Sequence, residues 1–165
     1  MPESLTPNVL QLVPSMESGG VERGTVDVSD YLRHQGCTSV VISKGGGLVP
    51  TLEADGAIHI VMDLTTHNPF IIYKNLQKIK QVIKRYNINI IHARSRIPGI
   101  YGLLLARCLK IPYLTTIHSA YPYKTWMKKQ YNALMTKSDA IIVPSAFIKE
   151  HVAAHYGVAL SKMTV

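Results

Sequence analysis

The sequence predicts an α/β fold with a largely parallel sheet of about six strands, and three observations support this prediction. Short apolar or β-branched runs alternate with segments of helical periodicity along the whole chain. The run over residues 88–93 is almost continuously apolar, which is typical of a parallel strand covered on both faces. The chain has 165 residues, so we expect a single domain with a sizeable core.

The N-terminal half is predicted to alternate three strands with three helices. Strand runs are apolar or β-branched, and helix runs repeat apolar residues every three or four positions. The third helix has the clearest start, because Asn68 is a good N-cap residue and Pro69 suits the first helical position. The expected strands are 9–13, 38–43 and 58–61, and the expected helices are 21–32, 49–54 and 69–86.

The C-terminal half repeats this alternation. Pro98 is expected to open its first helix, on which Leu104 and Cys108 should face inward. Cys37 and Cys108 form no closely spaced pair, so both are expected to be buried thiols in a reduced, cytosolic protein. The expected strands are 88–93, 112–117 and 139–143, and the expected helices are 98–108, 126–137 and 145–156.

The net charge of +8 indicates an anionic partner, which could be nucleic acid, a phosphorylated substrate or an acidic membrane surface. No apolar run approaches the ~20 residues of a membrane span. The chain lacks GxGxxG after its first strand, GxxxxGK[ST] and GxSxG, which disfavours dehydrogenases, P-loop enzymes and α/β hydrolases. Its seven histidines do not cluster with acids at ligand spacing, so neither a metal nor another cofactor is expected.

Polar residues follow four of the predicted strands, at the edge of the sheet where α/β proteins bind ligands. The carboxyl ends of parallel strands lie along one edge, so these four groups are expected to line one site. They are residues 18–23, 94–96, 118–121 and Ser145.

The first group contains Gly19-Gly20 between a strand and a helix. Glycine lets a ligand approach the backbone closely, and free N–H groups at a helix start bind anions. Alternatively, the pair only makes a tight turn. Glu22 is expected to cap the helix start or to contact a ligand. Arg23 is expected to reach a phosphate or to pair with an acid.

Arg94 and Arg96 lie two residues apart, so in an extended chain both are expected to face one way. The guanidinium group of arginine binds phosphate and carboxylate groups well, so the two residues are expected to bind the ligand. Alternatively, they belong to a solvated loop that binds nothing. His92 lies within the apolar strand and is expected to be a core histidine with satisfied hydrogen bonds. Ser145 is either an N-cap or a ligand contact.

Four segments of the chain resemble, in order, blocks of the N-terminal domain of family 4 glycosyltransferases, the "group 1" family with the GT-B fold. They are VPSMESGGVER (13–23), IHARSRIP (91–98), TTIHS (115–119) and IVPSAFI (142–148). The resemblance covers nearly the whole chain and is greatest to the bacterial branch that builds lipopolysaccharide and related envelope glycans. Ser119 stands where family members often have glycine. Pro144-Ser145-Ala146 stands where they often have Val-Ser or Pro-Ser-Glu.

This resemblance implies a Rossmann-like three-layer domain, one half of a GT-B fold. It also implies a retaining enzyme that transfers a sugar from a nucleotide-sugar donor to a lipid-linked or glycan acceptor, in bacterial envelope polysaccharide or lipopolysaccharide synthesis. Residues 1–165 would be the acceptor-binding domain, inactive alone, with the interdomain linker beginning near 161–165 and the donor-binding domain outside this chain. The expected location is cytoplasmic, on the inner face of the membrane.

The resemblance also assigns residues to the site. His118 is expected to be catalytic, contacting the transferring sugar or the acceptor, and the alternative is a histidine bonded to backbone at a strand end. The expected substrate-binding residues are Gly19, Gly20, Glu22, Arg23, Arg94, Ser95, Arg96, Ser119, Tyr121 and Ser145.

A basic and aromatic segment suggests a membrane contact. Aromatic side chains favour the headgroup region, and lysines favour anionic lipids. The alternative is a surface helix with Trp126 buried in the core. The residues are Tyr123, Lys124, Trp126, Lys128 and Lys129. Two other function classes stay open: a non-catalytic basic module for nucleic acid or acidic partners, and a nucleotide-binding regulatory domain. The glycosyltransferase interpretation expects no nucleic acid.

Overall fold

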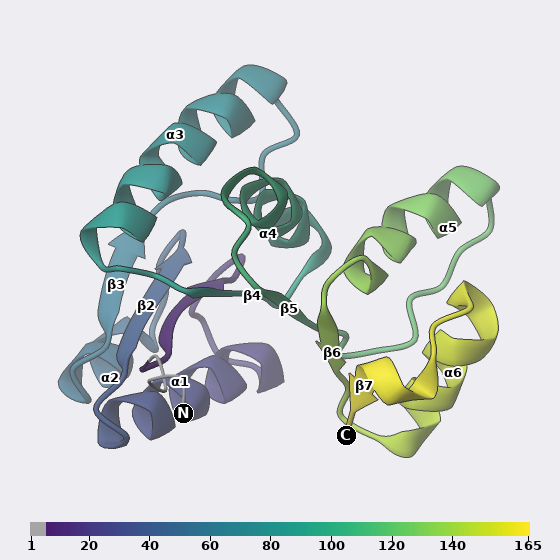
Figure 1. Cartoon of the computed structure of the whole chain (residues 1–165), viewed down its shortest axis with the longest axis horizontal. Helices are drawn as coiled ribbons and strands as arrows, with labels where there is room; N and C mark the ends of the chain where they lie inside the picture. Colours follow the sequence, from purple (N-terminus) through teal and green to yellow (C-terminus); the bar gives the residue numbers. More distant parts are fainter. Residues whose placement is uncertain (1–5) are drawn as a thin grey trace.

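The computed structural model describes residues 6–165, which form a seven-stranded, entirely parallel sheet with helices on both sides (Figure 1). The α/β prediction is therefore confirmed, with one strand more than expected. The strands are β1 (Asn8–Leu12), β2 (Thr38–Ser43), β3 (Ile58–Val61), β4 (Ile90–Ala93), β5 (Tyr113–Thr116), β6 (Ala140–Ile142) and β7 (Met163–Thr164). Their order across the sheet is β3-β2-β1-β4-β5-β6-β7.

Six α-helices and two short 3₁₀ turns connect the strands in the described part of the chain. The sequence patterns that predict the helices also account for their ends. Asn68 caps its helix by accepting a hydrogen bond from Phe70 N at 3.0 Å. The helices are α1 (Gly20–His34), α2 (Val49–Ala54), α3 (Pro69–Arg85), α4 (Arg96–Leu109), α5 (Trp126–Ala133) and α6 (Ala146–Tyr156), and the 3₁₀ turns are η1 (Leu134–Thr136) and η2 (Leu160–Lys162).

Three expectations for the C-terminal half need correction. Helix α4 begins at Arg96, two residues before Pro98. Leu104 and Cys108 lie on the solvent side of this helix and are exposed, whereas Cys37 is buried as expected. Residues 163–164, taken from the resemblance as the start of a linker, pair with β6 as a seventh strand.

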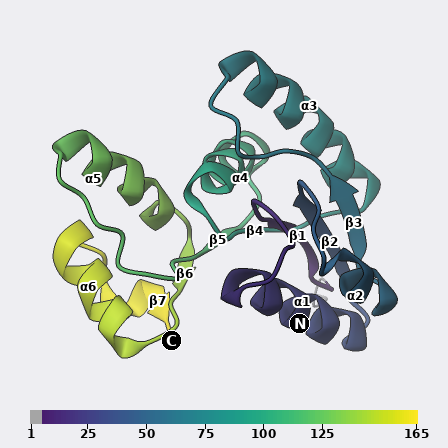
Figure 2. The ribbon, with the colours of Figure 1, turned by 180° about the vertical axis from the view of Figure 1, so that it is seen from behind.

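The core lies between the sheet and the helices that cover its two faces. Figures 1 and 2 show α1 and α2 on one face of β1–β3, and α3 and α4 over the other face. Helices α5 and α6 flank β6 and β7 at the far end of the sheet. The largest cluster of buried side chains joins central strands to α3 and α4, as illustrated by Leu12, Ile91, Ile79 and Tyr101.

The direction of the chain across the sheet reverses between β1 and β4. From β1 the chain moves outward to β2 and β3, and α3 then carries it back to β4 on the other side of β1. Connections between parallel strands are right-handed, so outward and returning connections cover opposite faces. The loops that follow β1 and β4 therefore diverge, and we refer to the edge of the sheet between them as the crevice. Open α/β sheets bind their ligands at such a crevice.

Candidate functional site

The loop after β1 is held in place by the loop after β2. Met16 N donates to Gly45 O at 2.9 Å, and Leu48 N donates to Met16 O at 2.8 Å. Gly46 has φ of 149°, and a Cβ there would overlap the Met16 backbone, so only glycine fits this close approach. The Gly45-Gly46-Gly47 segment thus supports the wall of the crevice, a role that sequence reasoning missed although the triple glycine signalled a special backbone.

Gly19 and Gly20 form a helix start and not a left-handed turn. Gly19 is the extended N-cap residue of α1, with φ of 176° and ψ of 172°, and makes no side-chain cap. Arg23 N donates to Gly19 O at 2.9 Å, which closes the first helical turn. A Cβ added to Gly20 would meet nothing within 4 Å, so the backbone there is open to a ligand. The N–H groups of this first turn are available to an anion.

The carboxylate of Glu22 folds back over Gly19. A Cβ on Gly19 would lie 2.5 Å from Glu22 Oε2, so glycine leaves the room that this carboxylate occupies. Glu22 Oε1 accepts from Ser15 Oγ at 3.5 Å. Arg23 is exposed on the next position of the helix, where no carboxylate of residues 6–165 forms an ion pair with it.

Arg94 is buried at the end of β4, with 6% of its surface exposed. Its Nε donates to Gln11 Oε1 at 3.2 Å, and its Nη1 lies beside Gly24, where an added Cβ would be 3.5 Å away. Burial lowers the pKa of Arg94 to about 10, which leaves it charged at neutral pH. The described residues provide no carboxylate within 4.0 Å of this cation. The charge of Asp27 on α1 acts on Arg94 from beyond that distance, so the site contains a buried positive charge with no carboxylate in direct contact.

His118 follows β5 on the same side of the sheet as Arg94. Burial and the nearby Arg94 lower the pKa of His118, while Glu22 opposes this shift, so the imidazole is neutral at neutral pH. Its Nε2 is buried and forms no hydrogen bond within residues 6–165. Loops after β1, β4 and β5 thus bring Glu22, Arg94 and His118 together, as the strand-end argument predicts. An unpartnered buried ring nitrogen is what a ligand hydroxyl would satisfy.

His92 is a core residue, which confirms the sequence prediction. It is 2% exposed, and its Nε2 lies 2.7 Å from Thr116 Oγ1. Burial, Arg94 and His118 together lower the pKa of His92 to about 3. His92 is therefore neutral at neutral pH and forms the floor beneath His118 and Arg94.

Arg94 and Arg96 do not face one way, contrary to the prediction from their spacing. Arg94 contacts Gln11 and Gly24 toward α1, whereas Arg96 Nη1 donates to Asn132 Oδ1 of α5 at 3.1 Å. The prediction assumed an extended chain, but α4 begins at Arg96, and the helical turn rotates its side chain away.

Arg96 instead belongs to an aromatic cluster beside α5. Its guanidinium carbon lies 4.9 Å from the ring centre of Tyr121 and 5.4 Å from that of Tyr131. Burial raises the pKa of the Tyr121 hydroxyl. Tyr131 and Asn132 were not singled out from the sequence, because the helical pattern there predicted only an ordinary surface helix.

The three serines of the predicted site lie at different kinds of position. Ser145 is an N-cap, since its hydroxyl accepts from Ile148 N at 3.3 Å at the start of α6. Ser95 occupies the N-cap position of α4 but makes no side-chain cap. Ser119 is exposed after His118. Ser95 and Ser119 therefore keep hydroxyls available at the crevice edge.

The basic and aromatic segment begins α5, whose N-cap Thr125 accepts from Lys128 N at 3.3 Å. Trp126 is 72% exposed, so the alternative in which it packs in the core is wrong. Met127 beside it is 75% exposed, and Lys124 and Lys128 are also exposed. The start of α5 thus projects two large apolar side chains between two lysines.

Tyr123 and Lys129, also assigned to the membrane contact, are half-buried against the domain. The Tyr123 ring centre lies 6.2 Å from those of His155 and Tyr156 on α6. The ammonium of Lys129 lies 5.4 Å from the same tyrosine ring. These two residues anchor the start of α5 to the domain and present little surface of their own.

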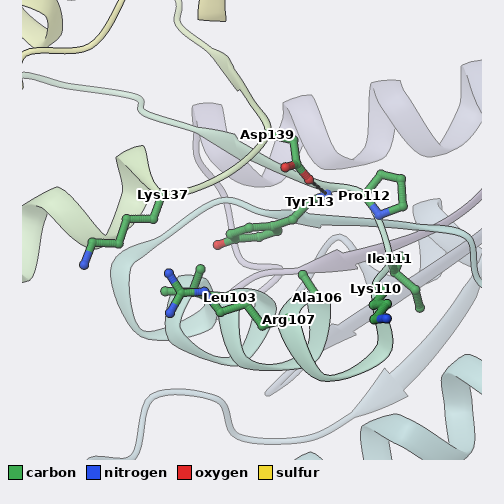
Figure 3. Close-up of a pocket in the computed structure, with 9 residues that line it drawn as sticks. All are labelled: Leu103, Ala106, Arg107, Lys110, Ile111, Pro112, Tyr113, Lys137 and Asp139. Carbon is green, nitrogen blue, oxygen red and sulfur yellow. Dashed lines mark hydrogen bonds between the residues drawn. The ribbon is translucent and has the colours of Figure 1, made fainter.

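A cavity of about 560 Å³ lies away from the crevice, at the amino ends of β5 and β6 (Figure 3). Asp139 on its wall is bonded to Tyr113 N at 2.8 Å, and none of the predicted site residues lines it. The cavity is lined by Leu103, Ala106, Arg107, Lys110, Ile111, Pro112, Tyr113, Lys137 and Asp139. In residues 6–165 no group of histidine, cysteine and acidic side chains could hold a metal ion.

Comparison with known proteins identifies relatives of this fold and site. The family model described as Glycosyltransferase Family 4 matches residues 18–165. The crystal structure of a glycosyltransferase from Rickettsia africae superposes with a TM-score of 0.83 at 39% sequence identity, over 96% of this chain and 42% of that one. No curated protein sequence matches the chain.

More distant structures share the fold. Anabaena HepE in complex with UDP and glucose gives a TM-score of 0.74 at 15% identity, over 96% of this chain and 44% of that one. The lipopolysaccharide outer core galactosyltransferase WaaB gives 0.69 at 14% identity, with the same coverage of 96% and 44%. The chain spans less than half the length of these proteins. Within the described residues, no helix is long and apolar enough to cross a membrane.

Proposed function

Because the chain belongs to glycosyltransferase family 4, we propose that it is the N-terminal, acceptor-binding domain of a retaining enzyme that transfers a hexosyl unit from a nucleotide-sugar donor. The single observation that carries this proposal is the group of Glu22, Arg94 and His118 at the crevice between β1 and β4. The proposed acceptor is a lipid-linked or glycan molecule of bacterial envelope polysaccharide or lipopolysaccharide synthesis.

We propose that donor and acceptor are bound by different domains, and the length of the related proteins supports this. This chain covers only 42% to 45% of the Rickettsia glycosyltransferase, HepE, WaaB and a Neisseria UDP-GlcNAc 2-epimerase, so these proteins continue beyond the region equivalent to it. A second domain would hold most of the nucleotide-sugar and close over the carboxyl edge of this sheet. Residues 1–165 alone should then bind ligand fragments but transfer no sugar.

Sugar transfer breaks the bond between the anomeric carbon and the diphosphate oxygen and makes a bond to an acceptor hydroxyl oxygen, which loses its proton. Negative charge develops on the departing diphosphate. Arg94 and the free N–H groups at the start of α1 provide positive potential for this charge. His118 is neutral, so its Nε2 can accept a hydrogen bond or a proton from a sugar or acceptor hydroxyl.

The other predicted residues would bind the acceptor along the same edge. Arg96, held over Tyr121, offers a cation and an aromatic surface of the kind that binds sugar rings and anionic groups. The hydroxyls of Ser95 and Ser119 lie next to it in sequence and are free of caps. Neither a metal nor another cofactor enters this proposal, because donor and acceptor supply all of the reacting atoms.

The test is the turnover of the full-length protein with His118→Ala. Loss of one proton-transfer or transition-state contact typically costs about 10²–10⁴-fold in rate, and we expect a loss in that range with little change in unfolding free energy. The control is His67→Ala, an exposed histidine in the loop between β3 and α3, which should change neither quantity. Turnover of His118→Ala close to wild type would show that this residue is only structural.

We also propose that the start of α5 contacts an anionic membrane where a lipid-linked acceptor lies. The exposure of Trp126 and Met127 between Lys124 and Lys128 supports this contact. Each lysine near an anionic surface contributes on the order of 1 kcal/mol, and salt weakens this attraction. The peripheral location on the cytoplasmic face follows from this contact and from the cytoplasmic source of nucleotide-sugars.

Vesicle sedimentation tests the membrane contact. Lys124→Glu/Lys128→Glu should reduce partitioning onto anionic vesicles at least about 30-fold, because two contributions of about 1 kcal/mol are lost. The matched control is Lys78→Glu/Lys84→Glu on α3, which changes the net charge equally but lies on another surface. If both pairs reduce binding alike, only the overall charge matters and the contact assigned to α5 is wrong.

A further inference from the structure

Gln11 is the one polar residue of β1 whose side chain enters the core, and it is completely buried. Its Nε2 donates to Thr25 O at 3.2 Å and to Ser29 Oγ at 2.8 Å, both on α1. Ser39 Oγ donates to Ser29 Oγ at 3.0 Å, which extends the network to β2. Burying an amide side chain in an apolar core costs free energy unless the amide forms hydrogen bonds. The hydrogen bonds of Gln11 therefore indicate a specific role for this residue.

The network determines which way the amide points. A backbone carbonyl only accepts hydrogen bonds, so the Gln11 NH₂ group must face Thr25 O on α1. The amide oxygen therefore faces the opposite direction, where it accepts from Arg94 Nε at 3.2 Å. Gln11 thus fixes one edge of the guanidinium and leaves the two Nη groups to point away from it.

Those Nη groups lack a partner. Neither forms a hydrogen bond within residues 6–165, and Arg94 has no ion pair there, although the side chain is 94% buried. A buried cation with no carboxylate in direct contact is costly to hold, and the longer-range charge of Asp27 on α1 offsets this cost only in part. Proteins retain such a group where a ligand provides the anion, and Nη1 lies beside Gly24 in the second turn of α1.

We propose that Gln11 is a positioning residue that holds Arg94 so that its Nη groups bind an anionic phosphate group of a substrate. A glutamine suits this task better than a glutamate, because its neutral oxygen orients the guanidinium without cancelling the charge that the phosphate needs. The phosphate belongs either to the donor diphosphate or to a lipid-linked acceptor, and only this choice rests on the proposed function. The geometry of Gln11 and Arg94 stands independently of it.

The experiment is an NMR titration of the chain with inorganic pyrophosphate, which follows the Arg94 Nε–H signal. In the wild type this proton should exchange slowly, because it is bonded to Gln11, and its signal should shift as pyrophosphate binds. Gln11→Met keeps the size and burial but removes the acceptor. We expect this variant to lose the protected Nε–H signal and to bind pyrophosphate about tenfold more weakly.

Two further variants make the result decisive. Ser29→Ala removes one anchor of the amide and should weaken binding two- to threefold even if Gln11→Met does not fold. Asn75→Leu removes another buried amide, which bonds Asp63 O and Tyr101 Oη far from Arg94, and should leave binding unchanged. Equal losses in Ser29→Ala and Asn75→Leu would mean that general destabilisation explains the effect, and would overturn the proposal.

The ligand series identifies the source of the phosphate. UDP represents the donor and a short isoprenyl diphosphate represents a lipid-linked acceptor, and whichever binds more tightly than pyrophosphate is the source. Equal affinities for pyrophosphate, UDP and the isoprenyl diphosphate would mean that the site recognises only the phosphate groups. An Arg94 signal that ignores all three ligands would overturn the proposal. If instead pyrophosphate binding depends on Gln11 but the full-length protein transfers no sugar, the proposed function fails and this inference stands.

Discussion

Acidification should destabilise this domain through His92. In the folded state its pKa is about 3, whereas an exposed histidine has a pKa of 6.5. The folded protein resists protonation here, because burial removes water from the charge and Arg94 and His118 repel it. The destabilisation is therefore small above pH 6.5 and grows progressively as the pH falls from 6.5 toward 3.

The magnitude follows from these two pKa values. At pH 5 the unfolded chain gains about 2 kcal/mol from protonating this histidine, while the folded state remains almost entirely neutral. At pH 7 the same contribution is only about 0.2 kcal/mol. His92 alone should thus lower the free energy of unfolding by roughly 2 kcal/mol between pH 7 and pH 5, a large share of the 5–15 kcal/mol of a typical domain.

Urea unfolding at pH 7, 6 and 5 measures this contribution. His92→Gln should reduce the pH dependence by about 2 kcal/mol relative to wild type, although other histidines still contribute. The matched control is Thr116→Val, which removes the hydrogen bond to His92 but keeps the imidazole buried, and it should retain the wild-type pH dependence. A pH dependence of His92→Gln equal to that of the wild type would refute the assignment of the effect to this residue.

Two further predictions concern glycines. Gly102→Ala should destabilise the domain by about 1–3 kcal/mol, because its Cβ would lie 2.5 Å from the buried ring of Tyr113. Gly24→Ala should instead stabilise α1 by up to about 1 kcal/mol, since its Cβ only touches Arg94 at 3.5 Å. Thermal unfolding of both variants measures these opposite changes in stability. Gly20→Ala should leave the free energy of unfolding unchanged, because its Cβ meets nothing in the protein, but it should weaken pyrophosphate binding at the proposed anion site. If a titration gives this variant the wild-type affinity for pyrophosphate, Gly20 only forms the helix start and does not contact the ligand.

The class of fold and most element boundaries can be predicted from local sequence patterns. Alternation of apolar runs with helical periodicity is a local signal, so it survives without knowledge of tertiary contacts. The same holds for Asn68 as an N-cap and for His92 as a core residue, because a cap needs only its own helix and an apolar strand implies burial. The parallel sheet also placed the polar strand ends at one edge, which brought Arg94 and His118 into one site.

The orientation and pairing of the side chains at that edge depend on contacts between residues far apart in the sequence. Arg94 and Gln11 are 83 residues apart, and β1 and β4 pair only because the chain crosses back over the sheet. Arg96 turns toward α5 because a helix starts at that residue, a boundary that moves by one or two positions without any change in sequence pattern. Tyr123, just before α5, packs against His155 and Tyr156 of α6, whereas Trp126 is exposed. Hydrophobic periodicity alone does not reveal which aromatic side chain finds a partner.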